Sequence, residues 1–191
     1  FTTAGITHPA QGSAEFDGYS SGDYIATDSL PITDFTNFTM SAWFNVKDGS
    51  VTRGIVTFAN TSNNTPLALL EYITAGNIRF NYRPDSGSLS SNDSNAVSLN
   101  EWYYVTATKE GTALKIYLDG SLNDSSTISD TTITIDKFSI GSLVRSTIAN
   151  YMDGNLANVA IWNRALSSDE INSVMWKGYQ SLTDNEKSGL Q

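Results

Sequence analysis

The sequence predicts an all-β fold, an antiparallel β-sandwich that is followed by one short C-terminal helix. Short runs of β-branched and aromatic residues recur between turns rich in Gly, Asn, Asp and Ser, as in sandwiches. Several of these runs alternate apolar and polar residues, which is the period of a strand with one buried face. The length of 191 residues fits one domain spanning 1–191.

The first expected strands lie within residues 14–27, as a short pair around a Gly/Ser turn. In residues 39–46 every second residue from Met40 to Val46 is apolar, and Trp43 points to the opposite face with its polar neighbours. Apolar runs at 55–60 and 67–73 predict two further strands.

A hairpin is expected where the turn TAGN leads into residues 78–83. Every second residue from Ile78 to Tyr82 shares one face, and Arg79, Asn81 and Arg83 share the other. Residues 101–120 predict a second hairpin, with turns at 110–111 and 119–120.

The last strands are expected within 131–142 and over 156–162. Residues 157–158 are expected to form a β-bulge, since the apolar residues of this strand are otherwise out of step. A helix then follows, because Ser167 and Glu170 form a capping box and Ile171 and Val174 repeat at helical spacing.

Composition excludes several function classes. The net charge is −9 with only 11 Lys and Arg and no basic stripe, so nucleic acid is not an expected partner. The absence of cysteine excludes thiol nucleophiles, disulfides and zinc–thiolate sites. No run approaches the roughly 18 apolar residues of a membrane span. The chain begins without Met or a signal peptide, and we expect it to be a piece of a longer protein.

Five segments in order carry a family resemblance. They are FDGYSSGDYI (16–25), FTNFTMSAWFN (35–45), NEWYYVTATKEGTALKIYLDG (100–120), FSIGS (138–142) and MDGNLANVAIWNRALSSDEI (152–171). On these segments the chain resembles the laminin-G-like domains of the concanavalin A-like lectin/glucanase superfamily. The resemblance implies an antiparallel jelly roll of two stacked, curved sheets.

The chain departs from this family at a position that often binds calcium. Members often carry two acidic residues after Gly-x-Ile in the last strand, and here residues 154–159 read GNLANV, without a carboxylate. Calcium takes six to eight oxygen ligands, usually with several carboxylates. Asn158 could still supply its side-chain carbonyl oxygen, and Asp17 or Asp23 could contribute from the first strands. Without the two acidic residues, the absence of bound calcium is expected over its presence, and no other cofactor is expected.

No catalytic group is evident, and we predict that the chain is not an enzyme. Glycan hydrolysis needs two carboxylates about 5–10 Å apart, and no strand carries such a pair. The only histidine, His8, lies outside the patterned segments, so no Ser-His-Asp group is expected. A lyase could use Tyr82 with Arg83, but adjacent strand residues point to opposite faces.

Two residue clusters are candidates for ligand binding. The connections 61–66, 84–100 and 120–132 are polar and are expected to share one end of the sandwich, with 110–112 at the other. A sugar site needs an aromatic face and polar groups for the hydroxyls. The first cluster, around 84–100, contains Tyr82, Arg83, Asp85, Asn92, Asp93 and Trp102. The second contains Arg53, Tyr151, Asp153 and Trp162. Core packing is the simpler role for Trp43 and Trp102, whereas Trp162 is expected to be less buried.

These observations predict a non-catalytic carbohydrate-binding or adhesion module of a secreted, cell-surface or virion protein. Its expected partners are a glycan or polysaccharide and the neighbouring domains or subunits of a larger protein. The alternative is a structural decoration or spacer domain, whose contacts are only with neighbouring protein. Such a domain should show a sizeable apolar patch or a self-associating face.

Overall fold

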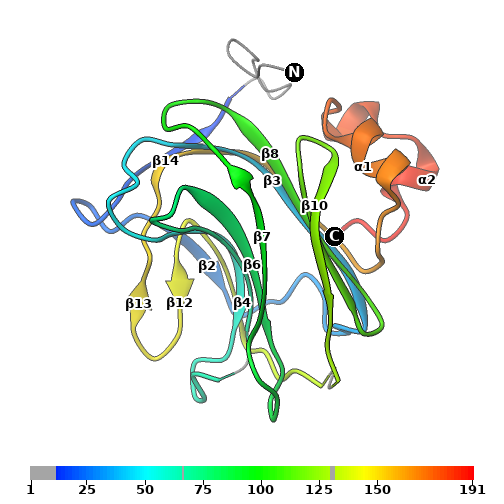
Figure 1. Cartoon of the computed structure of the whole chain (residues 1–191), viewed down its shortest axis with the longest axis horizontal. Helices are drawn as coiled ribbons and strands as arrows, with labels where there is room; N and C mark the ends of the chain where they lie inside the picture. The colour runs from blue at the N-terminus through cyan, green and yellow to red at the C-terminus, as the bar shows by residue number, and fades with distance from the viewer. Residues whose placement is uncertain (1–11, 66, 130–131) are drawn as a thin grey trace.

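The structure, a computed structural model, describes residues 12–65, 67–129 and 132–191. Its described strands form two six-stranded antiparallel sheets and a small hairpin, which confirms the predicted fold class. Figure 1 shows the two curved sheets, with the helices on one side and the β12–β13 hairpin on the other.

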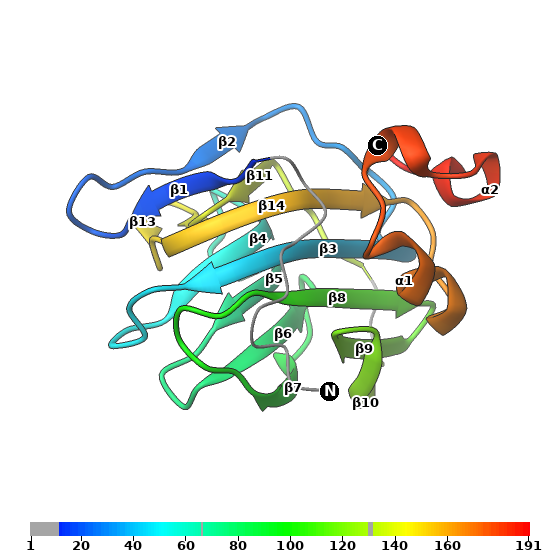
Figure 2. The ribbon, with the colours of Figure 1, turned by 90° about the horizontal axis from the view of Figure 1, so that it is seen from above.

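Both sheets join strands that are far apart in the sequence, as in a jelly roll. Sheet A has the order β1-β14-β3-β8-β9-β10, with the bounds Ala14–Asp17, Asp153–Trp162, Asn37–Val46, Tyr103–Glu110, Ala113–Leu118 and Ser121–Thr127. Sheet B has the order β2-β11-β4-β5-β6-β7, with the bounds Ile25–Thr27, Lys137–Ile140, Arg53–Ala59, Leu67–Tyr72, Asn77–Arg83 and Ser90–Ala96. Figure 2 shows β1, β14, β3 and β8 lying side by side.

The remaining elements are short. The hairpin pairs β12 (Leu143–Val144) with β13 (Ile148–Ala149). The C-terminal segment contains α1 (Ser168–Val174), a 3-10 helix (Tyr179–Ser181) and α2 (Asp184–Lys187).

The core lies between the sheets and is built by the predicted alternation. Met40 and Phe44 of β3 face Phe58 and Phe80 of sheet B within one cluster of buried side chains. Each such apolar side chain stabilises the fold by about 1.5–3 kcal/mol on full burial. The outward residues of β3 are buried as well, because a second apolar cluster packs there against α1.

The C-terminal helices cover the outer face of sheet A. The indole of Trp43 donates to Met175 O at 2.8 Å, and that of Trp162 donates to Glu186 O at 2.8 Å. The predicted capping box of Ser167 and Glu170 is present. Trp162 is 1% exposed, so the expectation of a less buried side chain is wrong. The reason is that the last residues fold back, and Leu190 forms a β-bridge with Trp162.

Two connections that were expected to be polar loops contain the strands β7 and β10. These strands are the outer edges of the two sheets and lie beside each other (Figure 1). Polar side chains join them: Ser126 Oγ donates to Asn92 Oδ1 at 2.8 Å, and Asn95 N donates to Asn123 Oδ1 at 2.6 Å. Their Ser, Asn and Asp composition lacks the β-branched pattern by which strands are recognised.

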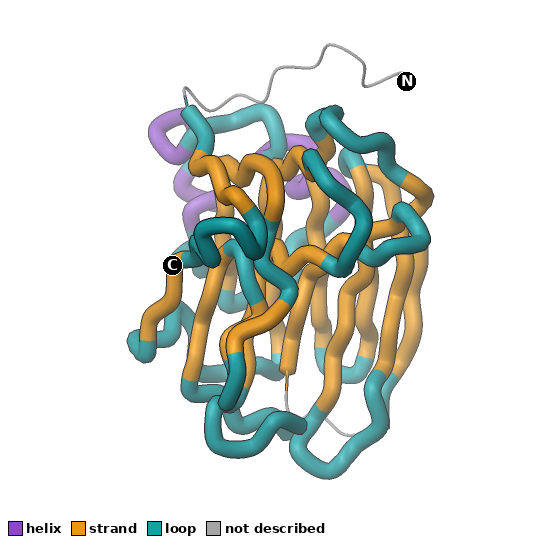
Figure 3. Tube along the Cα trace, turned by 90° about the vertical axis from the view of Figure 1, so that its left-hand side faces the viewer, coloured by secondary structure: helices purple, strands orange, loops and turns teal. Residues whose placement is uncertain are grey.

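Because strand β7 was not predicted, the 110–112 turn was assigned to the wrong end of the sandwich. Gly111 N donates to Thr36 O at 3.2 Å, which places this turn beside the start of β3. It therefore lies at the same end as 61–66, not at the opposite end. Figure 3 shows the loops gathered at the two ends of the strands. The predicted bulge in β14 is confirmed, with the register shift between Ala157 and Ala160.

Candidate functional site

Two residues of the first predicted cluster face the core and are unavailable to a ligand. Tyr82 is fully buried and stacks on Phe38 with ring centroids 6.3 Å apart. Asn92 is 1% exposed and accepts a hydrogen bond from Ser126. Both belong to the inward-facing rows of sheet B, in register with Ala68 and Phe80 respectively. Their assignment to a binding surface has therefore no support in the structure.

Two others lie apart from the rest of that cluster. Trp102 packs against the apolar cluster on the outer face of sheet A. Asp85 holds the end of the sandwich together, since its carboxylate accepts from Thr134 N at 2.9 Å and Thr134 Oγ1 at 2.7 Å. The structure thus leaves Arg83 and Asp93 as the cluster members on a common open face, the outer face of sheet B.

The middle of this outer face is polar and centred on Glu71 of β5. Glu71 is 7% exposed, and its carboxylate accepts from Asn81 Nδ2 at 2.7 Å and from Asn150 Nδ2 at 3.0 Å. Burial raises the pKa of Glu71, and the bonds from Asn150 and Asn81 and the charge of Arg79 only partly oppose this. The two amides therefore hold a carboxylate that is otherwise removed from water.

Arg79 lies between Glu71 and Asp93, because the three residues are in register across β5, β6 and β7. Its guanidinium binds the Asp93 carboxylate in a bidentate manner, with Nε–Oδ1 at 2.6 Å and Nη2–Oδ2 at 2.8 Å. This pair raises the pKa of Arg79. The Arg79 cation thus separates the two carboxylates.

A pair of arginines lies farther along the same face, toward the 61–66 loop. Arg83 Nη2 and Arg145 Nη1 donate to the same carbonyl, Asn64 O, at 3.0 and 2.6 Å. Burial, and secondly the charge of Arg83, lower the pKa of Arg145. The Nε of Arg145 is buried and has no hydrogen-bond partner. Two convergent cations of this kind suit an anionic group.

The β12–β13 hairpin brings Arg145 to this face. Leu143 packs on Ala59, Leu67 and Leu69, which anchors the hairpin on the outer side of sheet B. Glu71 lies four positions along β5 from Leu67, which is in register with Arg83. Glu71 and Arg83 are therefore about 13 Å apart along the strands.

The predicted metal residues do not come together. Asp17 pairs with Asp153 at the start of β14, whereas Asn158 lies five residues farther along that strand. At about 3.3 Å per residue their Cα atoms are roughly 15 Å apart. Within 12–65, 67–129 and 132–191, no three His, Cys, Asp or Glu side chains form a group that could hold a metal ion.

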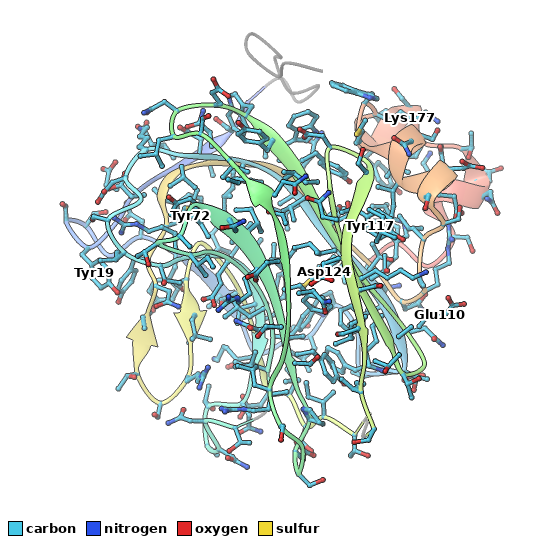
Figure 4. The ribbon with its side chains drawn as sticks, in the orientation of Figure 1. Tyr19, Tyr72, Glu110, Tyr117, Asp124 and Lys177 are labelled. Carbon is cyan, nitrogen blue, oxygen red and sulfur yellow. The ribbon has the colours of Figure 1, made fainter. Side chains whose placement is uncertain are left out.

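The second predicted cluster is brought together in part. Arg53 donates to Tyr151 O at 3.1 Å and lies 3.9 Å from the Asp153 carboxylate, whereas Trp162 is at the far end of β14. The exposed ring of Tyr19, which sequence reasoning missed, packs edge-on against Tyr151 at 5.0 Å. Figure 4 shows Tyr19 at the rim of the molecule. Its hydroxyl accepts from Asn150 N at 3.2 Å, so this aromatic rim adjoins the Glu71 site.

Sequence reasoning missed most of the outer-face site. The signal for part of it was present, because alternation had placed Arg79, Asn81 and Arg83 on one face of their strand. Glu71, a lone charge within an apolar run, was a second signal. Arg145 and Asn150 come from a distant hairpin, and no local pattern connects them to this face.

Comparisons place the chain among lectin-like sandwiches. A family model described as the concanavalin A-like lectin/glucanases superfamily matches residues 17–172. No curated protein matches the sequence. No helix within the described parts of the chain is long and apolar enough to cross a membrane.

Several solved structures share the fold at low sequence identity. The CBM40 of the Ruminococcus gnavus IT-sialidase, bound to α2,3-sialyllactose, is 18% identical with a TM-score of 0.74, covering 88% of this chain and all of that one (100%). A pentraxin from Limulus polyphemus is 14% identical with a TM-score of 0.68, covering 84% of this chain and 80% of that one. A botulinum neurotoxin serotype D binding domain is 20% identical with a TM-score of 0.67, covering 89% of this chain and 44% of that one.

Proposed function

Because the chain belongs to the concanavalin A-like lectin/glucanase superfamily, we propose that it is a non-catalytic module that binds an acidic glycan on the outer face of sheet B. The observation that carries this proposal is the Arg83–Arg145 pair, whose two guanidinium groups converge on one carbonyl oxygen. In a chain of net charge −9, two adjacent cations are held together at an electrostatic cost that an anionic ligand would remove.

The chemistry of the face fits a sugar acid. The arginine pair suits a carboxylate, while the half-buried Asn150, which covers Glu71, offers an amide for hydroxyls. The structurally similar CBM40 was solved with sialyllactose, whose sialic acid carries a carboxylate, and this supports a ligand of the same class.

The same face argues against catalysis. A glycosidase needs one carboxyl group as acid and a second one free to act as base or nucleophile. Here Asp93 is held by Arg79 in a bidentate pair, and the Arg79 guanidinium lies between Asp93 and Glu71. We therefore assign these groups to binding, in an extracellular, cell-surface or virion-surface protein in which neighbouring domains or subunits are further partners.

The role of a spacer domain is the second candidate. One observation favours it: among the described strands β2 pairs only with β11 and forms an edge of sheet B, its residues Ile25–Thr27 are exposed, and Ile25 is 54% exposed. Such an edge can pair with a strand of a neighbouring chain. A monomer in sedimentation experiments at all accessible concentrations, together with glycan binding, would argue against this role.

A glycan array followed by calorimetry tests the binding function. The array should include sialylated, uronic-acid and neutral saccharides, each with and without calcium. We expect acidic glycans to bind. Arg145→Gln should lower the affinity for them roughly 10- to 100-fold, since a hydrogen bond to a charged group contributes about 1.5–3 kcal/mol.

The matched control is Lys115→Gln, which removes one cation from β9 of the other sheet and should leave the affinity unchanged. Binding of the natural chain should weaken as salt is raised. No binding to any saccharide, or binding that Arg145→Gln leaves unaltered, would contradict the proposal. Turnover of a bound glycan that is lost in Glu71→Gln would contradict the non-catalytic assignment.

A further inference from the structure

A cavity of about 300 Å³ lies on the opposite side of the molecule from the proposed glycan face. Its lining residues come from the outer face of sheet A and from the C-terminal segment. Figure 2 shows this segment packed against the end of sheet A. Its walls are mainly aliphatic and aromatic and come from β14, α1 and the last residues, with Trp162, Val174, Met175, Tyr179, Leu182 and Leu190 among them. The cavity thus differs in chemistry from the polar face of sheet B.

Asn158 lines this cavity from an unusual backbone position. It lies in the β14 bulge with φ at +47°, in the left-handed region that non-glycine residues rarely adopt. Bulges of this kind often re-aim a side chain next to a functional site. The bulge keeps Asn158 in this conformation although its Cβ disfavours a positive φ.

The amide of Asn158 also has unused hydrogen-bonding capacity. Its Nδ2 is buried and has no hydrogen-bond partner in the structure. A buried donor without a partner costs free energy, and a bound acceptor would remove that cost. Rotation of the amide about the Cβ–Cγ bond would turn Nδ2 toward an acceptor placed in the cavity.

The charged group of the lining is already neutralised. Lys177 lines the cavity, and its ammonium contacts the Glu186 carboxylate at 2.5 Å and Ser173 Oγ at 2.8 Å. The side chains of the lining therefore leave no unpaired charge for an ionic ligand, and a neutral one fits better. Tyr179 is 62% exposed, so the wall that it forms adjoins solvent and gives a ligand access.

From these features we infer that the cavity is a second binding site, for a small neutral molecule of one or two rings that carries one hydrogen-bond acceptor. Its rings pack among the aliphatic and aromatic walls, and its acceptor receives the Nδ2 hydrogen of Asn158. The size is sufficient, because an apolar cavity of about 150 Å³ already holds benzene. This site is independent of the proposed glycan function.

Acetophenone and ethylbenzene test the inference, because they have similar shapes and only acetophenone carries an acceptor. The full chain, labelled with ¹⁵N, is titrated with each probe and followed by NMR. We expect shifts of the Trp162 indole and the Asn158 amide, and an affinity for acetophenone roughly three- to tenfold higher than for ethylbenzene.

Variants then separate the contributions. Asn158→Gly relieves the positive φ, so it should fold, and it should remove the preference for acetophenone while ethylbenzene still binds. Asn155→Ala, on the same strand but away from the cavity, is the matched control and should keep the preference. Ala160→Val narrows the cavity and should weaken both probes.

Two results would overturn the inference. The first is the absence of shifts with either probe at millimolar concentration. The second is equal binding of both probes that Asn158→Gly does not change. Arg145→Gln should leave the probes unaffected, so failure of this site and failure of the glycan site can be told apart.

Discussion

The carboxylate of Glu186 links α2 to α1, and Glu186→Gln tests how strongly this link stabilises the C-terminal segment. Its Oε1 accepts from Lys177 Nζ at 2.5 Å and from Ser173 Oγ at 2.6 Å, and its Oε2 accepts from Thr183 N at 2.7 Å. These hydrogen bonds, that of Lys177 above all, lower the pKa of Glu186 from 4.5 to about 2. Figure 4 shows Lys177 at these helices.

The size of this effect follows from the pKa. The depression to about 2 corresponds to on the order of 3 kcal/mol between the two protonation states. The Lys177 side chain is 28% exposed, so water screens part of its attraction for the carboxylate. We therefore expect Glu186→Gln to lower the free energy of unfolding at pH 7 by about 1–2 kcal/mol.

The pH dependence has a definite sign. Because the pKa of Glu186 is lower in the folded state, its stabilisation is complete above pH 4.5 and is lost as the pH falls toward 2. The difference in unfolding free energy between the natural chain and the variant should thus shrink over this range.

Urea unfolding, followed by tryptophan fluorescence at pH 7 and pH 3, measures both effects. Glu110→Gln is the control, since Glu110 is exposed at the end of β8, and it should change the free energy of unfolding by less than about 0.5 kcal/mol. A Glu186→Gln variant as stable as the natural chain at pH 7 would refute the reasoning. So would a difference that is the same at both pH values.

Three further predictions concern stability. Burial raises the pKa of Glu71, so its ionised form opposes folding at pH 7. As the pH is lowered from 7 toward 4.5, the free energy of unfolding of the natural chain should therefore rise relative to that of the Glu71→Gln variant. Urea unfolding measures this difference. An unchanged difference would contradict this. Gly154→Ala should lower the free energy of unfolding by more than about 3 kcal/mol, since a Cβ there would lie 1.9 Å from Asn45 O. Gly76→Ala should lower it by about 1 kcal/mol, because Gly76 has φ at +89° but open space around it. Equal melting temperatures for these two variants would count against the close approach. Ser167→Ala should cost about 1 kcal/mol by removing the cap of α1, measured in the same way, and no loss would show that the capping box is dispensable.

The fold could be predicted from the sequence wherever side chains alternate in polarity. The runs at 39–46 and 78–83 carry that alternation, and the structure places their apolar residues in the core. The strands β7 and β10 carry none, because they are edge strands joined across the seam between the sheets by hydrogen bonds to polar side chains. Composition alone could not distinguish such strands from solvated loops.

The candidate site was only partly predictable for a related reason. Tyr82 was grouped with Arg83 by nearness in sequence, although alternation already assigned the two residues to opposite faces of β6. The partners that complete the site come from much farther away, since Arg145 reaches a carbonyl 81 residues before it and Asn150 a carboxylate 79 residues before it. Such pairings depend on where the hairpin packs, and no local pattern records that.

The same hairpin explains why the two outer faces of the sandwich offer different chemistry. On sheet A the C-terminal helices bury most of the apolar cluster and leave a partly open cavity lined by β14. On sheet B the hairpin packs around Leu69, Asn150 covers Glu71, and only the Arg79 and Asp93 side chains of the polar row stay partly exposed. Asn150 fixes the base of the hairpin, since its carbonyl accepts from Gly54 N at 2.6 Å while its side chain binds Glu71. The position of Arg145 beside Arg83 is therefore set by packing against sheet B, so the two cations are held in place before any ligand arrives.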